Sequence, residues 1–310
     1  MTTAFLFPGQ GVQHVGMGAD LASASIHARD VLQEVDEALG QNLSRLMREG
    51  PEDELTLTAN AQPAIMAVSL AVLRVLEREG GVRLSERAAF VAGHSLGEYS
   101  ALCAAGALGL TQTARLLRVR GDAMQAAVKP GVGAMAALLG MDLDAARAVA
   151  VDAAEREVCA VANDNAPGQV VLSGHADAIE RAILLAKAAG AKKAVRLAVS
   201  APFHCALMEP AARAMEAAFG RETIHTPFVP LVANVTAAPV AAPADIARLL
   251  VEQVTGMVRW REGVGVMAEA GVERFVELGA KVLGPMGKRI APGAEQVSLL
   301  TMADMEAWAR

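Results

Sequence analysis

The 310-residue chain is 53% hydrophobic with a net charge of −6, which predicts a folded protein with a sizeable buried core. An aromatic content of 3% and the lack of long single-sign charge runs argue against nucleic-acid binding, although not against an acidic ligand. Cys103, Cys159 and Cys205 lie far apart without metal-ligand spacing, so we expect free thiols in a reducing compartment and no metal site. Residues 1–8 contain no basic leader and no uninterrupted apolar stretch is long enough to span a membrane, so we expect a cytoplasmic protein.

The N-terminal third predicts a strand followed by helices. Residues 3–7 are typical of a short buried strand that Pro8 ends. The glycine-containing loop 9–13 then lies where parallel α/β sheets place ligand sites, although its local pattern by itself favours an ordinary Pro-Gly turn. Apolar residues at spacings of three and four predict helices over residues 20–49 and 64–78.

A second strand and a tight turn follow. Apolar residues 88–92 predict a buried strand, and the alanine- and leucine-rich sequence after Gly97 predicts a helix. Gly93-x-Ser95-x-Gly97 therefore has the context of a nucleophile elbow, which exposes a serine hydroxyl beside a helix N-terminus. Glycine is expected at both ends because the two backbones approach too closely for a Cβ atom. A chance G-x-S-x-G in a glycine-containing loop is the alternative.

The middle of the chain predicts a separate unit. Before it, a helix with Thr111 as N-cap is expected to run through Ala127. The elements predicted after it are strands and helices in the order β-α-β-β-α-β: residues 132–139, 143–157, 158–163, 169–173, 176–189 and 194–199. This order is typical of a ferredoxin-like subdomain. We therefore predict a large domain from residues 1–127 and 199–310, an inserted subdomain 128–198, and a ligand cleft between them.

The remaining sequence returns to the large domain. The elements predicted there are a helix over 210–219, a strand around 229–234, helices over 244–254 and 260–270, and a last strand over 274–278. Ser95 would need a base to activate it, and His204 is the best placed of the six histidines because it follows a predicted strand. His94 adjoins the serine, but neighbouring side chains in an elbow point in different directions. No Asp or Glu near His204 is an obvious third member of a triad.

Several motifs together carry a resemblance to a known family. They are Phe-Pro-Gly-Gln-Gly (7–11), Gly-His-Ser-Leu-Gly-Glu-Tyr (93–99), Arg120, Ser-Ala-Pro-Phe-His (200–204), Asn-Val-Thr (234–236), and Gln253 before Val-x-Trp (258–260). In this order and spacing, over the whole chain, the sequence resembles the malonyl-CoA:acyl carrier protein transacylases. The resemblance implies an α/β-hydrolase-like core with a parallel sheet and an inserted ferredoxin-like (βαββαβ) subdomain.

The resemblance also implies a role for each matching residue. It implies that Ser95 is the acylated nucleophile, His204 the general base, and Arg120 the residue that binds the malonyl carboxylate. The backbone N–H groups of Gln10 and Leu96 would form an oxyanion hole. The main-chain carbonyl of Gln253 would orient the histidine, and Phe203 would determine acyl selectivity. The implied partners are malonyl-CoA and the phosphopantetheine thiol of acyl carrier protein, with no cofactor, no metal, no nucleic acid and no membrane. A monomer is expected.

Other interpretations stay open from the sequence. An acyltransferase subunit of malonate decarboxylase would share the motifs and chemistry but use another carrier, and a serine esterase would share only the elbow. A non-enzymatic scaffold of the same fold ranks last, because it would not retain the serine, histidine and arginine together. The basic side chains of the insertion are candidates for contact with an acidic carrier protein, although a solvated charged face is the simpler interpretation: Lys187, Lys192, Lys193 and Arg196.

Overall fold

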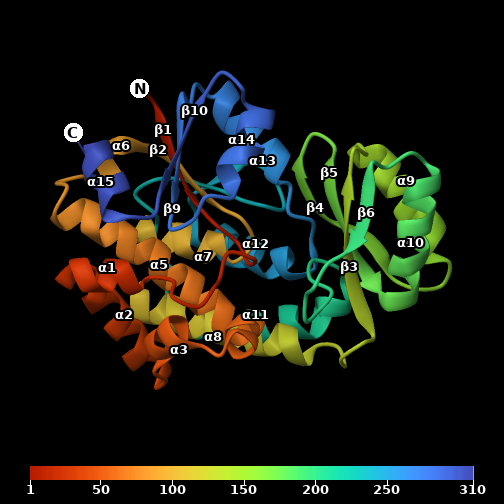
Figure 1. Cartoon of the computed structure of the whole chain (residues 1–310), viewed down its shortest axis with the longest axis horizontal. Helices are drawn as coiled ribbons and strands as arrows, with labels where there is room; N and C mark the ends of the chain where they lie inside the picture. Colours follow the sequence, from red (N-terminus) through yellow and green to blue (C-terminus); the bar gives the residue numbers. More distant parts are fainter. Residues whose placement is uncertain (310) are drawn as a thin grey trace.

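The computed structural model describes residues 1–309, which form two β-sheets surrounded by helices (Figure 1). The strands of the large sheet are β1 (Thr3–Phe7), β2 (Ala88–Gly93), β7 (Leu231–Val232), β8 (Pro239–Val240), β9 (Arg274–Leu278) and β10 (Glu295–Leu299). They lie in the order β10-β9-β1-β2-β7-β8, and every neighbouring pair is parallel except the terminal β7–β8 pair. The predicted α/β class with a parallel sheet is confirmed.

Helices cover both faces of this sheet. Alternation along β1 sends Phe5 and Phe7 into the main core, with Ala4 and Leu6 in a second apolar cluster on the opposite face. The helices that contribute to the main core are α1 (Ala19–Ala24), α2 (Ile26–Leu39), α3 (Leu43–Glu49), α4 (Glu52–Thr56), α5 (Thr58–Arg78), α6 (Leu84–Arg87), α7 (Gly97–Ala104), α8 (Leu110–Ala126), α11 (Glu209–Phe219), α12 (Pro243–Thr255) and α15 (Met302–Ala309). Helices α13 (Trp260–Glu269) and α14 (Leu283–Ile290) cover the other face.

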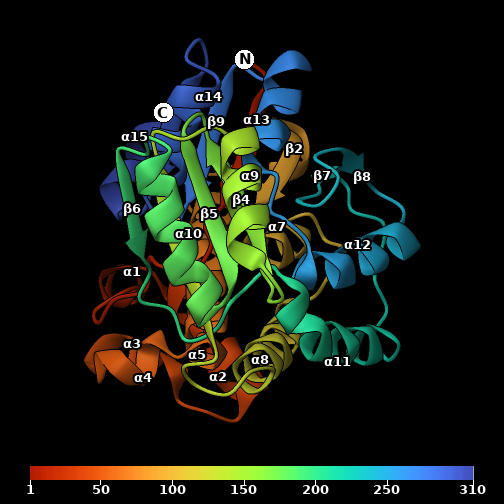
Figure 2. The ribbon, with the colours of Figure 1, turned by 90° about the vertical axis from the view of Figure 1, so that its right-hand side faces the viewer.

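The second sheet comes from the middle of the chain. Its elements, in chain order, are β3 (Gly133–Leu139), α9 (Leu143–Ala154), β4 (Cys159–Ala166), β5 (Gln169–His175), α10 (Ala176–Ala188) and β6 (Lys193–Arg196). The strands form an antiparallel sheet in the order β4-β5-β3-β6, and α9 and α10 pack on one face of it (Figure 2). The predicted ferredoxin-like subdomain is confirmed, whereas its boundaries at residues 128 and 198 stay a prediction.

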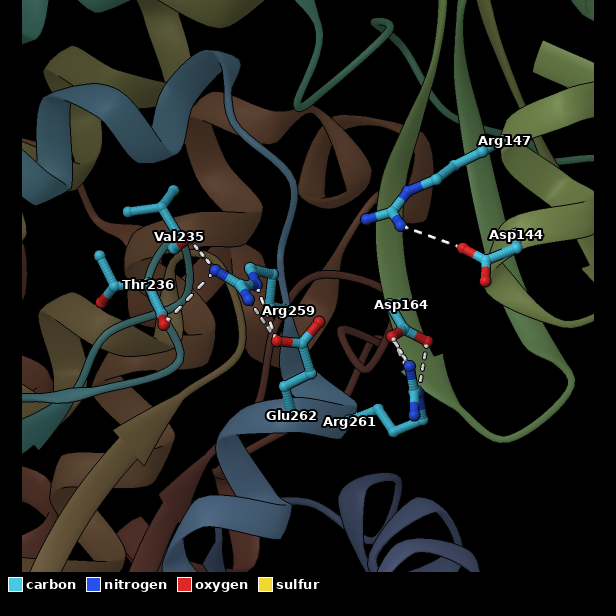
Figure 3. A network of polar contacts seen from close by, with 8 residues as sticks. All are labelled: Asp144, Arg147, Asp164, Val235, Thr236, Arg259, Arg261 and Glu262. Atoms are coloured by element: carbon cyan, nitrogen blue, oxygen red, sulfur yellow. Dashed lines mark hydrogen bonds and ion pairs between the residues drawn. The ribbon is translucent and has the colours of Figure 1, made fainter. Parts of the chain in front are cut away.

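Polar contacts join the two sheets at β4 and the start of α13. Arg261 of α13 forms an ion pair with Asp164 of β4 at 2.8 Å, and the Asp164 side chain is 1% exposed (Figure 3). Beside this pair, the amide of Val258 donates to the carbonyl of Ala162, and the amide of Asp164 donates to the carbonyl of Val258. A buried carboxylate must be paired to be tolerated, so this junction holds the small sheet in one position against the large domain.

Three expectations about the elements were wrong. The helix expected from residue 64 begins at Thr58, because Pro63 near the start of α5 removes only one intrahelical hydrogen bond. The N-cap of α8 is Gly109 rather than Thr111, with the Gln112 side chain accepting from the Gly109 amide at 3.1 Å. The strand β9 is not the last, since β10 pairs with it at the sheet edge; the polar β10 sequence Glu-Gln-Val-Ser-Leu lacks the apolar pattern of a buried strand.

Helix α5 is the central element of the main core. By length and composition it is the one helix within residues 1–309 that could cross a membrane, but 89% of its apolar window is buried inside the molecule. Its apolar side chains face α2, α7 and α8 and the sheet. Helix α5 is therefore a core helix of this fold.

The turn between β2 and α7 brings backbone segments into direct contact. A Cβ atom on Gly93 would lie 1.8 Å from the carbonyl carbon of Gly97, and one on Gly97 would lie 2.3 Å from the carbonyl oxygen of Phe7. Ser95, between them, has a φ of 53°, in the left-handed region that non-glycine residues rarely adopt. Glycine at both ends of the elbow is thus required by space, as the sequence predicted.

Gly93→Ala should destabilise the protein by at least about 3 kcal/mol, the upper range for overpacking, because the neighbouring backbone cannot move aside. Gly265 is the matched control: it lies in α13, where a Cβ atom would have no other atom within 4 Å, so Gly265→Ala should be neutral or stabilise by up to about 1 kcal/mol. Urea unfolding of both variants measures the difference. Equal unfolding free energies for the Gly93 variant and the native protein would contradict the packing argument.

Candidate active site

The Ser95 backbone is held by side chains from distant segments. Its amide donates to Oδ1 of Asn234 at 2.8 Å, and Nδ2 of Asn234 donates to the carbonyl of Gly93 at 2.8 Å. The Ser95 carbonyl accepts from Nε2 of Gln253, also at 2.8 Å. These three bonds stabilise the strained conformation of the elbow and leave the Ser95 side chain free to point into the cleft.

His204 is the hydrogen-bond partner of the Ser95 hydroxyl. Its Nε2 lies 2.7 Å from Ser95 Oγ, and its Nδ1 lies 2.8 Å from the main-chain carbonyl of Gln253. A carbonyl can only accept, so the proton sits on Nδ1 and the neutral ring presents Nε2 to the serine as an acceptor. Burial, and then the charge of Arg120, lower the pKa of His204 to about 3. The imidazole is therefore neutral at physiological pH and able to accept the serine proton.

Arg120 of α8 lies on the other side of the serine. Its Nη2 donates to Ser95 Oγ at 3.0 Å and to Oε1 of Gln253 at 2.8 Å, and its Nη1 donates to Oε1 of Gln62 at 2.8 Å. The side chain is 1% exposed and forms no ion pair within residues 1–309. Its hydrogen-bond acceptors are neutral oxygens. The Tyr99 ring lies 5.6 Å from its Cζ, and the buried Glu98 carboxyl interacts with its charge from a distance, so no carboxylate is bonded to it directly. Such a guanidinium is suited to bind the carboxylate of a ligand through two parallel hydrogen bonds.

Glu98 and Gln253 form the polar layer beneath the serine. Glu98 Oε1 accepts from the Asn234 amide at 2.7 Å, and its Oε2 accepts from Nε2 of Gln253. Burial raises the pKa of Glu98 to about 8, although these donors and the charge of Arg120 oppose the shift. Gln253 is fully buried and contacts Ser95, Glu98, Arg120 and His204 at once, so one residue fixes the relative positions of the others.

These side chains open onto a cavity of about 350 Å3 between the two sheets. Ser95, His204 and Arg120 line it together with the two residues expected to donate backbone N–H groups, Gln10 and Leu96. The amides of Gln10 and Leu96 have no acceptor within residues 1–309, so both are free to bind a ligand oxygen. The remaining wall is largely apolar and comes from both sheets and their loops, including Leu57, Met124, Met135, Val171, Leu197, Val199, Phe203, Val282, Leu283 and Met286.

The structure thus brings together candidate site residues that lie far apart in the sequence. His204 and Arg120 each contact the Ser95 hydroxyl, Gln253 contacts both of them, and Phe203 lines the cavity beside the histidine. The catalytic and binding roles of these residues, and of Gln10 and Leu96, stay predictions.

Two other expectations concern basic side chains and metals. The basic side chains suggested for carrier contact lie outside the cavity lining, and Arg196 forms an exposed ion pair with Glu180 at 2.9 Å. Within residues 1–309, no group of three or more His, Cys, Asp or Glu side chains could hold a metal ion.

Sequence reasoning missed several polar residues of the site. Gln62 is 1% exposed within the apolar stripe of α5, and a lone amide at such a position is a signal that it binds a buried partner. Glu98 gave a similar signal, as an acid in the otherwise apolar start of α7. Asn165, whose Oδ1 lies 2.8 Å from Nε2 of His94, was assigned to a loop although it belongs to β4.

Comparisons with known proteins agree with this geometry. The family model described as "Acyl transferase domain" matches residues 4–283. The chain is 44% identical over 288 residues to the malonyl CoA-acyl carrier protein transacylase of Escherichia coli K12, covering 93% of this chain and 92% of the relative.

Solved structures give the same result. An acyl-carrier-protein S-malonyltransferase from Bartonella henselae superposes with a TM-score of 0.97 at 52% identity, covering 99% of this chain and 98% of that one. A malonyl-transacylase in complex with its type II PKS acyl-carrier protein superposes with a TM-score of 0.95 at 39% identity, covering 99% and 98%. The chain belongs to the malonyl-CoA:acyl carrier protein transacylase family of acyl transferases.

Proposed function

We propose that this protein transfers the malonyl group from malonyl-CoA to the phosphopantetheine thiol of an acyl carrier protein, and so supplies fatty acid synthesis. The observation that carries the proposal is the position of the buried, unpaired Arg120 guanidinium, 3.0 Å from the hydroxyl that His204 contacts on its other side. An acyl group attached to Ser95 would have its far end within reach of this cation. Malonyl carries a carboxylate there, whereas acetyl carries only a methyl group.

Acylation begins when His204 Nε2 takes the Ser95 proton and the oxygen attacks the thioester carbonyl. The developing oxyanion is bound by the amides of Gln10 and Leu96, and losing one such donor typically costs about 3–4 kcal/mol. Collapse breaks the C–S bond, the imidazolium protonates the departing CoA thiolate, and a malonyl ester remains on Ser95. The carrier thiol then enters the same cleft and gives its proton to His204. Its sulfur attacks the ester carbonyl, the C–O bond to Ser95 breaks, and His204 returns the proton to the Ser95 oxygen.

Arg120 also links substrate recognition to reactivity. In the empty site its positive charge is one cause of the lowered pKa of His204, and so opposes proton uptake by the ring. A malonyl carboxylate would neutralise that charge, which makes the imidazolium easier to form when the correct substrate is bound. Acetyl-CoA would leave the guanidinium buried and unpaired, and a site with such an unpaired group can reject an analogue by about 10⁴-fold.

The largely apolar wall of the cavity protects the ester from water. Phe203 lies in this wall directly before His204, where we expect its bulk to favour malonyl over branched acyl groups.

The two named alternatives are less well supported. Relatives that match over nearly the whole length of both chains are named for transfer to acyl carrier protein, which disfavours a malonate decarboxylase subunit, and a simple esterase has no use for the buried arginine.

We further propose that the protein acts as a monomer in the cytoplasm. It would consist of a large domain of residues 1–127 and 199–310 and an inserted subdomain of residues 128–198. The free thiol state of Cys103, Cys159 and Cys205 supports a reducing compartment. An acidic carrier would be attracted by basic side chains near the cleft, for which Lys187, Lys192, Lys193 and Arg196 stay candidates.

The function is tested by the intact mass of the protein after mixing with malonyl-CoA. We expect a malonyl adduct that is lost when phosphopantetheinylated carrier protein is added, with the malonyl group recovered on the carrier. Ser95→Ala should form no adduct, because the acyl group has no other attachment point in the cleft. An adduct that is released to water at the same rate with and without carrier would indicate a hydrolase.

Arg120→Ala should lower kcat/KM for malonyl-CoA by about 10³-fold, the effect of losing two charged hydrogen bonds of about 2 kcal/mol each. Use of acetyl-CoA relative to malonyl-CoA should rise, since the unpaired charge that rejects acetyl is gone. Arg115→Ala is the matched control, because Arg115 lies exposed on the same helix, where its Nε donates to the Ala38 carbonyl. Initial rates with both thioesters decide the matter, and an unchanged malonyl preference in the Arg120 variant would rule out its role.

The acid side of the pH profile should reflect the lowered pKa of His204. An unperturbed histidine, with a pKa near 6.5, is mostly protonated at pH 5 and would lose most of its activity as a base. With a pKa of about 3, His204 stays neutral there, so kcat/KM for malonyl-CoA should change little between pH 7 and about 5. Circular dichroism at each pH serves as the control for folding. A drop in kcat/KM with a midpoint near 6.5 in a folded protein would contradict this prediction.

A further inference from the structure

A second set of hydrogen bonds leaves Arg120 on the side away from Ser95. Arg120 Nη1 donates to Gln62 Oε1 at 2.8 Å, and Gln62 Nε2 donates to Thr58 Oγ1 at 2.9 Å. The Thr58 hydroxyl in turn donates to Oε1 of Gln10 at 2.8 Å. The series therefore connects the buried cation to Gln10, a loop residue that lines the same cavity.

The chemistry of the first member sets the direction of every bond. A guanidinium has donors and no acceptor, so Gln62 must turn its oxygen toward Arg120 and its nitrogen toward Thr58. The Thr58 oxygen then accepts from Gln62, and its proton is free only for an acceptor, which is Oε1 of Gln10. Bonds that all run in one direction from a charged donor polarise and strengthen one another in a low-dielectric interior.

The inner members of the series are buried and the last is partly exposed. Thr58 is fully buried and Gln62 is 1% exposed, whereas Gln10 is partly exposed on the loop after β1. A Cβ atom on Gly121, next to Arg120, would lie 2.5 Å from Ala59 Cα and 2.8 Å from the Thr58 carbonyl oxygen. The start of α5 is thus pressed against α8 beside the arginine, and the Thr58 hydroxyl is the point at which this packed pair holds the loop.

We propose that Thr58 is a positioning residue that couples Arg120 to the oxyanion-binding loop at Gln10, so that the cation that recognises the acyl carboxylate also orients the amide that stabilises the transition state. This inference rests on the proposed function, because it takes the roles of Arg120 and Gln10 from it. It adds a residue that does not line the cavity and contacts neither reacting group.

Thr58→Val removes the hydroxyl and keeps the shape of the side chain. The full-length variant should form the malonyl-enzyme about 10-fold more slowly at saturating malonyl-CoA, less than the 10²–10³-fold that follows loss of an oxyanion donor, because the amide is misplaced rather than removed. The concentration of malonyl-CoA at half-maximal rate should change less than about twofold, since Arg120 itself remains. Rapid-quench mixing with intact-mass detection measures both quantities.

Two controls separate positioning from a general loss of stability. Thr58→Ser keeps the hydroxyl and loses the methyl group, so it should restore most of the rate. Thr113→Val removes another fully buried threonine hydroxyl, one that donates to the Gly109 carbonyl at the start of α8, and should react like the native protein. If the Ser variant is as slow as the Val variant, or the Val variant reacts at the native rate, Thr58 is not a positioning residue.

The coupling itself is measured in the Arg120→Ala background, from second-order rate constants for acylation. Thr58→Val should slow that variant by less than about threefold, because the charged donor that orients the series is already absent. An undiminished effect there would overturn the coupling to Arg120. Failure of the native protein to form any malonyl-enzyme would instead reject the proposed function, which keeps the two results distinct.

Discussion

The close approach of three backbone segments around Ser95 is the constraint from which the rest of the site follows. The carbonyl of Phe7 at the end of β1, the end of β2 and the start of α7 lie closer together than any Cβ atom would allow. This contact forces Ser95 into a left-handed conformation and directs its side chain out of the sheet edge. It also places the loop after β1, with Gln10, next to the serine, because β1 and β2 are adjacent parallel strands.

The second constraint is electrostatic. Arg120 is buried with neutral oxygens as its only hydrogen-bond acceptors, and burial also holds His204 in its neutral form. A buried cation is unfavourable, and it persists here because Gln62, Gln253 and Ser95 each accept a hydrogen bond from it and the Tyr99 ring lies 5.6 Å from its Cζ, although no carboxylate is bonded to it directly. A ligand carboxylate removes that penalty, so the same arrangement that strains the empty site supplies selectivity for a dicarboxylic acyl group.

The inserted sheet completes the cleft and needs to be held firmly to do so. Met135 and Val171 of this sheet line the cavity, and Asn165 contacts His94 beside the serine. Their positions depend on the Asp164–Arg261 ion pair (Figure 3) and on the backbone hydrogen bonds of Val258 with Ala162 and Asp164. Because the Asp164 carboxylate is buried and requires its partially exposed Arg261 partner, the ion pair orients two packed units rather than adding stability.

The sequence by itself determined the features that depend on neighbouring residues. Glycines two residues either side of Ser95 predicted the elbow, and the order of strands and helices in the middle of the chain predicted the ferredoxin-like insertion, whereas the parallel sheet of the core was implied by the family motifs. The strand β10 and the first turn of α5 were missed, because a polar edge strand and a helix that contains Pro63 both lack the expected local pattern. The family motifs indicated His204, Arg120 and Gln253, but no local sequence pattern could show which residues of the site contact one another.

Only the tertiary structure decided those pairings. Ser95 meets His204 across 109 residues of sequence and Gln253 across 158, and Gln62 meets Arg120 across 58. Such contacts depend on how helices pack over a sheet, and periodicity within one helix shows which face is buried but not what lies opposite it. The chemistry of the site was therefore encoded locally in residue types, while its geometry arose from long-range packing.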